Sequence, residues 1–199
     1  MFDFETVYLA RHGQTEWNVE GRRQGRLDSP LTPTGLAQAR RNAEDARAEP
    51  IDALFCSPMG RARTTAEVFA AALGLAAQVV EELAEVDHGR LSGLVRAQVE
   101  AGWPGFEQAR ARDKYFCRFP DGESYADADA RAARALEAIA GSGARRPLLV
   151  SHEMIGRMLL KNLAGLSRTE ALALSHPSDL VYKVRPDRRE FVALSPATA

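Results

Sequence analysis

Basic and imidazole side chains come directly after two short apolar runs of this sequence. Arg11 and His12 follow the first run, and Ser151 and His152 stand at the end of the second. The carboxyl ends of parallel strands meet at one edge of an open α/β sheet, and ligands bind beyond that edge. If both runs are strands, two histidines and an arginine lie near the same ligand.

A third element brings another arginine to that edge. Ser57-Pro58 has the pattern of an N-cap followed by proline at the first helical position, so we expect it to open a helix that ends near Gly74. Arg61 then lies about one turn into this helix. A helix N-terminus offers free N–H groups and partial positive charge, and a guanidinium offers planar donors. This corner therefore suits a phosphate group.

The elements that position these residues alternate between strand and helix. Apolar runs predict strands at 6–10, 51–56, 78–80, 147–151, 181–184 and 191–194. Cap signals and helical spacing predict helices at 33–46, 57–74, 124–140 and 152–164. The last two strands read as a terminal hairpin or as adjacent edge strands. The pattern predicts an α/β three-layer sandwich, with a central, mostly parallel sheet and helices on both faces.

Length and net charge indicate how many domains the chain forms and which partners it is suited to bind. A chain of 199 residues corresponds to a single domain, and we expect residues 1–199 to form one, with a small excursion at about 95–122 over the active site. The chain has 26 Lys and Arg against 27 Asp and Glu, a net charge of −1. This balance gives no electrostatic reason to expect nucleic-acid binding. Oligomeric state has no readable signal, and a homodimer stays open.

Membrane, secretion and metal signals are not found in the sequence. No stretch reaches the ~18 apolar residues of a membrane span, and the first residues do not read as a signal peptide. Cys56 and Cys117 are scattered, which is typical of a reducing compartment, so we expect a cytoplasmic protein. Gly156 stands where a zinc-protease motif starting at His152 needs its second histidine. We expect no metal and no cofactor.

Five blocks of the sequence, taken together, resemble the histidine phosphatase superfamily, the phosphoglycerate-mutase-like proteins. The first block covers 9–32 and contains LARHGQTEWN and GRRQGRLDSPLT. The others are SPMGRA at 57–62, Glu85 with Gly89 four residues on, GES at 122–124 and VSH at 150–152. They follow the family's order over most of the chain, which makes the resemblance far more specific than Arg-His-Gly alone.

The resemblance implies a role for each residue at the predicted sheet edge. His12 matches the nucleophile, which becomes a phosphohistidine, and a neutral imidazole can do this without a metal. Arg11, Arg61 and His152 match the groups that hold the charge of the transferred phosphoryl group. We expect the other two histidines, His88 and His176, to be surface or hydrogen-bonding residues.

The resemblance also implies a proton donor and a set of substrate contacts. Glu85 matches the acid for the leaving alkoxide and then the base for water, although its acidic neighbours also fit a solvated face. Asn18, Gln24 and Gly25 match positions that contact phosphate or substrate.

Two positions depart from the family pattern. Leu91-Ser92-Gly93 stands where many phosphatases have Trp-Glu-Gly, and Glu153 follows the second histidine where a small residue is usual. The Glu153 carboxylate would repel a second anionic group on a substrate. Alternatively, Glu153 forms an ordinary helical ion pair with Arg157, four residues on.

Three functions are compatible with these residues. The first is a metal-independent phosphomonoesterase that hydrolyses a phosphorylated small molecule through a phosphohistidine. The second is a 2,3-bisphosphoglycerate-dependent phosphoglycerate mutase, which the short chain and Glu153 disfavour. The third is a non-catalytic binder of phosphorylated ligands, which the complete set of matched residues disfavours.

Overall fold

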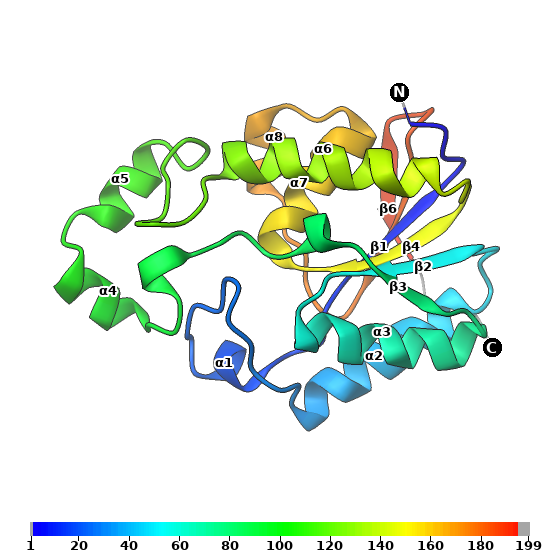
Figure 1. The fold of residues 1–199 in the computed structure, drawn as a ribbon, viewed down its shortest axis with the longest axis horizontal. Coiled ribbons are helices and arrows are strands. Elements are labelled where there is room, and N and C mark those ends of the chain that lie inside the picture. Colours follow the sequence, from blue (N-terminus) through cyan, green and yellow to red (C-terminus); the bar gives the residue numbers. More distant parts are fainter. Residues whose placement is uncertain (1, 195–199) are drawn as a thin grey trace.

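Six strands form one sheet in the computed structural model, which describes residues 2–194 (Figure 1). In chain order they are β1 (Val7–Arg11), β2 (Ala53–Cys56), β3 (Ala77–Val79), β4 (Pro147–Ser151), β5 (Val181–Arg185) and β6 (Glu190–Ala193). The spatial order is β3-β2-β4-β1-β5-β6. The first four of these are parallel, and the hairpin β5-β6 adds two antiparallel strands at one edge. The predicted mostly parallel sheet is confirmed.

Helices cover both faces of this sheet and give the predicted three layers (Figure 1). One face carries α2 (Pro33–Ala46) and α3 (Gly60–Leu73), and the other carries α6 (Tyr125–Gly141), α7 (Glu153–Ala164) and α8 (Arg168–Ala173). Successive residues of β1 alternate between the two cores, because Tyr8 packs with the first pair of helices and Leu9 with the second group. Burial on both faces explains why the central strands are continuous apolar runs.

The expected excursion contains two short helices that the sequence pattern did not predict. They are α4 (Arg96–Gly102) and α5 (Phe106–Arg112), and two 3-10 turns, η1 (Glu81–Leu83) and η2 (Gly89–Leu91), precede them. Both helices lie at the same end of the molecule as α1 (Glu16–Val19), which follows the carboxyl end of β1 (Figure 1). The excursion therefore projects from the edge where the predicted site residues gather.

Helix starts agree with the sequence in most cases and differ at α3. Thr32 caps α2 through a 3.0 Å bond from the Gly35 N–H, as Thr32-Pro33 predicts. The expected cap at Ser57 is wrong, because α3 begins at Gly60 with Met59 as its N-cap and without a side-chain cap. Arg61 is thus the second residue of the helix. The Ser57 hydroxyl makes a tertiary hydrogen bond instead, described below.

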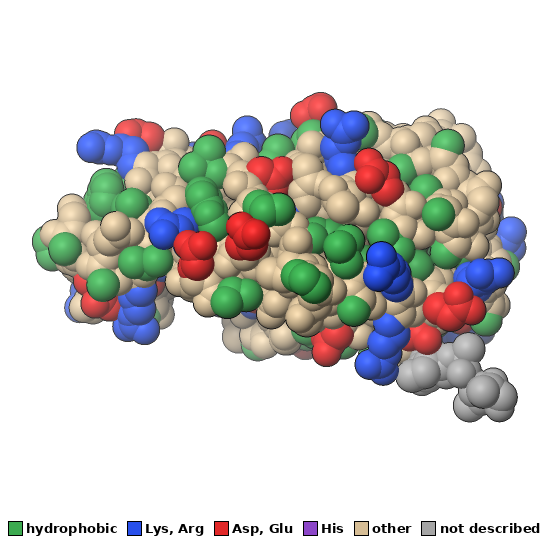
Figure 2. Space-filling view, turned by 90° about the horizontal axis from the view of Figure 1, so that it is seen from below, with side chains coloured by type: hydrophobic (Ala, Val, Ile, Leu, Met, Phe, Trp, Pro, Cys, Tyr) green, Lys and Arg blue, Asp and Glu red, His purple; other side chains and the backbone are tan. Residues whose placement is uncertain are grey.

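Charged side chains of both signs are interspersed on the face that Figure 2 shows.

All four histidines of the chain are buried, with exposures between 0% and 8%. This placement contradicts the expectation that His88 and His176 could be surface residues. Within residues 2–194, no helix is long and apolar enough to cross a membrane.

The first turn of α2 sits directly on the loop that carries His12. A Cβ atom on Gly35 would lie 2.1 Å from the carbonyl oxygen of Gln14, a distance that real structures do not tolerate. We therefore expect Gly35→Ala to lower the free energy of unfolding by about 1–3 kcal/mol, as overpacking does. Urea unfolding measures this change. Gly102→Ala is the matched control, because nothing lies within 4 Å of its Cβ position, and equal midpoints for both variants would contradict the contact.

Candidate active site

A polar cavity of about 160 Å³ opens beyond the carboxyl ends of β1 and β4. Eight of the nine predicted site residues line it, and the ninth, His152, is fully buried beside it. The lining residues are Arg11, His12, Asn18, Arg22, Arg23, Gln24, Gly25, Arg61, Glu85, His88, Glu153 and Met154. Residues from position 11 to position 154 thus converge at the predicted edge, where the parallel strands end.

His12 is held as a neutral imidazole with one nitrogen open for reaction. Its Nδ1 lies 2.8 Å from the Gly13 carbonyl oxygen, which only accepts, so Nδ1 carries the proton. Nε2 then holds the lone pair, which accepts a 3.3 Å hydrogen bond from Arg61 Nε. Burial lowers the pKa of His12 well below 6.5, and the nearby Arg61 and Arg11 lower it further, against the opposing Gly13 bond. The free Nε2 is therefore available at neutral pH.

Arg61 fixes the loop around His12. Its guanidinium is 1% exposed and donates to the Gly25 carbonyl (2.8 Å), the Leu27 carbonyl (2.7 Å) and Asp28 Oδ1 (3.0 Å). Burial lowers the pKa of this guanidinium, and the charges of Glu85 and Asp28 oppose that shift. One buried arginine thus joins the start of α3 to the 25–28 loop and to His12.

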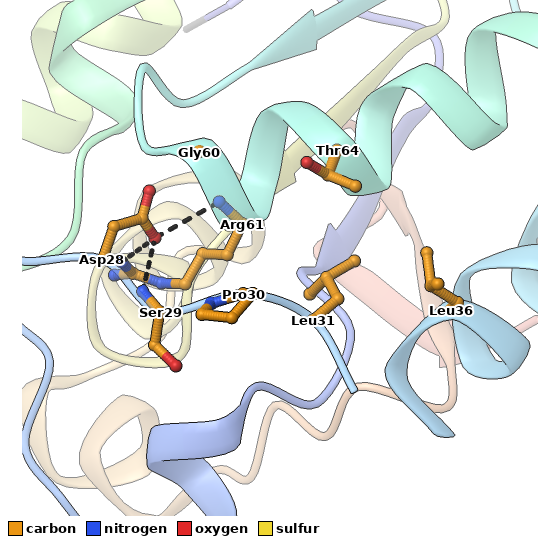
Figure 3. Close-up of a pocket in the computed structure, with 8 residues that line it drawn as sticks. All are labelled: Asp28, Ser29, Pro30, Leu31, Leu36, Gly60, Arg61 and Thr64. Carbon is orange, nitrogen blue, oxygen red and sulfur yellow. Dashed lines mark hydrogen bonds and ion pairs between the residues drawn. The ribbon is translucent and has the colours of Figure 1, made fainter. Parts of the chain in front are cut away.

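A second and larger pocket, of about 480 Å³, is also lined by Arg61 (Figure 3). Asp28 bonds both the backbone N–H and the side chain of Arg61 there, and Pro30, Leu31 and Leu36 supply much of the wall. The histidine and the carboxylates of the predicted site line the smaller cavity instead. We therefore place the chemistry in the smaller cavity.

His152 packs against His12, with ring centroids 5.1 Å apart. It follows β4 and forms the N-cap of α7, and its Nε2 lies 2.7 Å from the Ser57 hydroxyl. Among the described residues, Nδ1 has no hydrogen-bond partner. Burial lowers the pKa of His152 well below 6.5, and Arg61 lowers it further. The Ser57 contact was not predicted, since the sequence signal had assigned that hydroxyl to a helix cap.

The guanidinium of Arg11 has one nitrogen that is paired and one that has no partner in the described residues. Its Nη1 donates to the His176 carbonyl (3.2 Å) and pairs with Glu153 Oε2 (2.9 Å). Its Nε is buried and finds no partner within residues 2–194. An unpaired buried donor is costly, so this nitrogen is suited to an incoming anion.

Glu153 makes both kinds of contact that the sequence left open. Its Oε1 forms the i,i+4 ion pair with Arg157 at 2.5 Å, while Oε2 pairs with Arg11 at the cavity. The side chain is 35% exposed and lines the cavity. The carboxylate is therefore part of the wall as well as part of a helical ion pair.

Glu85 is buried, so the alternative of a solvated acidic face is wrong for this residue. It is 7% exposed and accepts hydrogen bonds from the backbone N–H groups of Val86 (2.9 Å), Met154 (3.2 Å) and Ile155 (3.0 Å). Two of these donors belong to the first turn of α7, where free N–H groups attract anions. The start of α7 thus places the Glu85 carboxylate at the cavity.

Arg131 on α6 holds the segment that carries Glu85, and the sequence reasoning missed it. Its guanidinium donates to the carbonyls of Glu82 (2.7 Å), Ala84 (2.6 Å) and Glu85 (3.3 Å), and it pairs with Glu123 at 2.8 Å. Glu123 lies in the GES block of the sequence. Through Arg131, this block therefore holds residues 82–85, the segment that carries Glu85.

Three of the predicted substrate contacts come from α1 and the loop after it, with Asn18 in the helix and Gln24 and Gly25 in the loop. Asn18 Oδ1 accepts from the Thr15 N–H at 3.0 Å, and Gln24 Nε2 donates to the Thr15 hydroxyl at 2.7 Å. Gly25 has a φ of +54°, and a Cβ there would lie 2.8 Å from the backbone nitrogen of His88. This close approach brings the loop against the opposite wall of the cavity.

Four residues that line the cavity were not predicted: Arg22, Arg23, His88 and Met154. The two arginines lie inside the block at 21–32, so the resemblance could have pointed to them. His88 stacks on Phe119 at 4.3 Å, and its Nε2 lies 3.2 Å from the Met154 sulfur. Burial lowers the pKa of His88 to about 3. No local signal marks a histidine as buried by a distant segment.

The excursion reaches the cavity wall from outside. Glu107 on α5 pairs with Arg23, and Phe119 stacks on His88. No residue from 95 to 122 is among those that line the cavity.

Within residues 2–194, no three His, Cys, Asp or Glu side chains form a cluster suited to a metal ion.

Comparisons with known proteins give the family of this chain. The sequence model of the histidine phosphatase superfamily (branch 1) matches residues 7–197. A Salmonella arizonae protein named "Probable phosphoglycerate mutase GpmB" is 38% identical over 164 residues, which cover 80% of this chain and 75% of that protein. The chain therefore belongs to the histidine phosphatase superfamily, whose members are phosphatases or mutases.

Two solved structures have the same fold. The alpha-ribazole phosphatase from Shigella flexneri superposes with a TM-score of 0.86 at 22% identity, over 98% of both chains. A mycobacterial glucosyl-3-phosphoglycerate phosphatase in complex with VO3 has a TM-score of 0.81 at 27% identity, over 95% of this chain and 97% of that one. Both neighbours are phosphatases by name, whereas the sequence relative is named as a mutase.

The buried neutral histidines make stability depend on pH. Burial lowers the pKa of His88 and of His176 to about 3, so both stay neutral in the folded protein at pH 5. Unfolded histidines, with a pKa near 6.5, take up protons below that pH, so the unfolded state binds more protons. We expect the free energy of unfolding to fall as the pH drops from 6.5 toward 5, with a slope for each such histidine that grows from about 0.7 to about 1.4 kcal/mol per pH unit.

Urea unfolding between pH 7.5 and 5 measures this slope. His176→Gln should reduce the slope by one proton, whatever it does to stability at pH 7.5. A wild-type stability that stays flat over this range would contradict the neutral buried state.

Proposed function

We propose that the protein is a metal-independent phosphomonoesterase that hydrolyses a phosphorylated small molecule through a phosphohistidine on His12. The observation that carries this proposal is the state of His12 itself. It is buried and neutral, and its Nε2 lone pair lies 3.3 Å from the guanidinium of Arg61 at the carboxyl end of β1. A nucleophile next to a cation can attack a phosphate without a metal ion, because the cation offsets the negative charge of the phosphoryl group.

In the first step, Nε2 of His12 attacks phosphorus and the bond to the leaving alcohol breaks. Negative charge then spreads over three phosphoryl oxygens. The open Nε of Arg11 donates to these oxygens, and so does Nε of Arg61, which loses its bond to His12 when the lone pair of Nε2 attacks. His152 donates from Nδ1, because the Ser57 hydroxyl can donate to Nε2 and leave the proton on Nδ1.

Glu85 handles the proton of the leaving group. A phosphate dianion beside its carboxylate brings two like charges into one cavity, which favours a proton held between them. Glu85 passes this proton to the leaving alkoxide. The carboxylate then takes a proton from water, which attacks the phosphohistidine, and inorganic phosphate leaves with His12 restored.

A phosphoglycerate mutase is the second candidate function. The observation that favours it is the name of the 38% identical relative. A mutase returns the phosphoryl group to a substrate hydroxyl instead of to water, so isomerisation of 3-phosphoglycerate is the assay that separates the two. The Glu153 carboxylate at the cavity favours the phosphatase, because it would repel the carboxylate of 3-phosphoglycerate.

Loss of His12 tests the nucleophile. We expect His12→Ala to abolish turnover of an aryl phosphate, because the attacking atom is gone, while the circular dichroism spectrum is retained. Wild-type protein quenched without acid during turnover should carry ³²P from the substrate, and His12→Ala should carry none. His152→Ala is the matched control, because it slows labelling and leaves the acceptor in place. Near-normal activity of His12→Ala would disprove the mechanism.

Substitution of Glu85 tests the proton donor. Glu85→Gln keeps the shape of the side chain and removes the acid, so poor leaving groups should suffer most. We expect kcat/KM to fall by about 10²–10⁴-fold for an alkyl phosphate, the usual contribution of general acid catalysis. An activated aryl phosphate needs little proton assistance and should lose far less. Equal losses on both substrates would show that Glu85 only positions other groups.

A further inference from the structure

Several side chains that line the cavity present hydrogen-bond acceptors with unused capacity. Gln24 is 7% exposed, and its Oε1 has no partner within residues 2–194. Glu153 adds a carboxylate, 35% exposed, at the same cavity. Its Oε1 pairs with Arg157 and its Oε2 with Arg11, and each oxygen keeps a second lone pair. An amide oxygen and an ionised carboxylate accept hydrogen bonds and cannot donate them. A ligand that satisfies them must therefore bring donors.

His88 is a third acceptor. The sulfur of Met154 only accepts, so the 3.2 Å contact places the imidazole proton on Nε2 and leaves a lone pair on Nδ1. This Nδ1 is buried and finds no partner among the described residues. The ring itself is 8% exposed and held by its stack on Phe119. A buried acceptor left unpaired costs free energy, which a hydroxyl group on a ligand would recover.

The arginines of the cavity leave no cation free for a second anion. Each of the four already faces a carboxylate of the protein, in the pairs Arg11–Glu153, Arg22–Glu20, Arg23–Glu107 and Arg61–Asp28. Two nearby cations, Arg110 and Lys114, have no ion pair in the described residues, but neither lines the cavity. Arg110 lies over the rings of Phe119 and Tyr125, and Lys114 donates to the Leu172 carbonyl at 3.3 Å. The open donors of Arg11 and His152 suffice for one phosphate group.

From these contacts we infer that the substrate is the phosphate ester of an uncharged, hydroxyl-bearing alcohol, a sugar or polyol phosphate, and that Glu153 excludes a second acidic group. The inference rests on the proposed function, because it describes the leaving alcohol of that reaction. The acceptors of Gln24, His88 and Glu153 bind hydroxyl groups of the alcohol. A carboxylate at the same place meets the charge of Glu153, and among the residues that line the cavity it finds no unpaired cation.

A matched set of substrates tests both parts. Glycerol 3-phosphate and 3-phosphoglycerate share a skeleton and differ by a hydroxymethyl group in place of a carboxylate. We expect kcat/KM to favour glycerol 3-phosphate by at least about fivefold, the factor for two like unit charges 4 Å apart in bulk water. Propyl phosphate has the same carbon chain without hydroxyl groups, and its kcat/KM should be at least about fivefold lower than that of glycerol 3-phosphate.

Variants of Glu153 assign the exclusion to this residue. Glu153→Gln and Glu153→Gly should each lower the preference for glycerol 3-phosphate over 3-phosphoglycerate by at least about fivefold, even if absolute rates fall. Glu100→Gln is the matched control, because Glu100 is an exposed residue of α4 that pairs only with Arg96, and its preference should equal that of the wild type.

The outcomes separate this inference from the proposed function. A wild type that prefers 3-phosphoglycerate or accepts propyl phosphate equally well, or Glu153 variants with an unchanged preference, would overturn the inference. Failure to hydrolyse any aryl phosphate would instead overturn the proposed function. In that case the same preferences are measured as dissociation constants by calorimetry with His12→Ala, where the same fivefold factors support the inference and equal constants refute it.

Discussion

The buried guanidinium of Arg61 is the interaction on which the site depends. A charge that is 1% exposed is stable only with its donors satisfied, and the carbonyls of the 25–28 loop together with Asp28 satisfy them. The same guanidinium contacts the lone pair of His12. The loop, the helix start and the imidazole are therefore positioned by one hydrogen-bonding group.

Burial also sets the chemical state of the histidines. In water an imidazole is partly protonated near neutral pH, and a protonated ring has no lone pair for attack. Burial of the two rings and the neighbouring arginines lower the pKa of both His12 and His152 well below 6.5. In the proposed reaction, the arginines that bind the phosphate also keep the neighbouring rings neutral, so anion binding and activation of the nucleophile share one physical cause.

The wall of the cavity is supported by contacts between the blocks that match the family and the 95–122 excursion. The 95–122 excursion contributes no lining residue, yet Glu107 holds Arg23 and Phe119 holds His88. Changes in the excursion can therefore reshape the cavity indirectly. Such an arrangement allows the alcohol side of a substrate to be selected while the phosphate side keeps its geometry.

The sequence by itself determined the sheet, the two covering layers and the convergence of Arg11, His12 and His152. Strand ends are local signals, and parallel strands place their carboxyl ends at one edge whatever the details of packing. The tertiary structure alone decided that Ser57 bonds His152 instead of capping α3, that Glu153 joins Arg11 to Arg157, and that His88 is buried. The Ser57 and Arg11 contacts join residues far apart in the chain, and the burial of His88 depends on distant segments. No periodicity or cap signal records such contacts, because their free energy exists only after the segments have packed together.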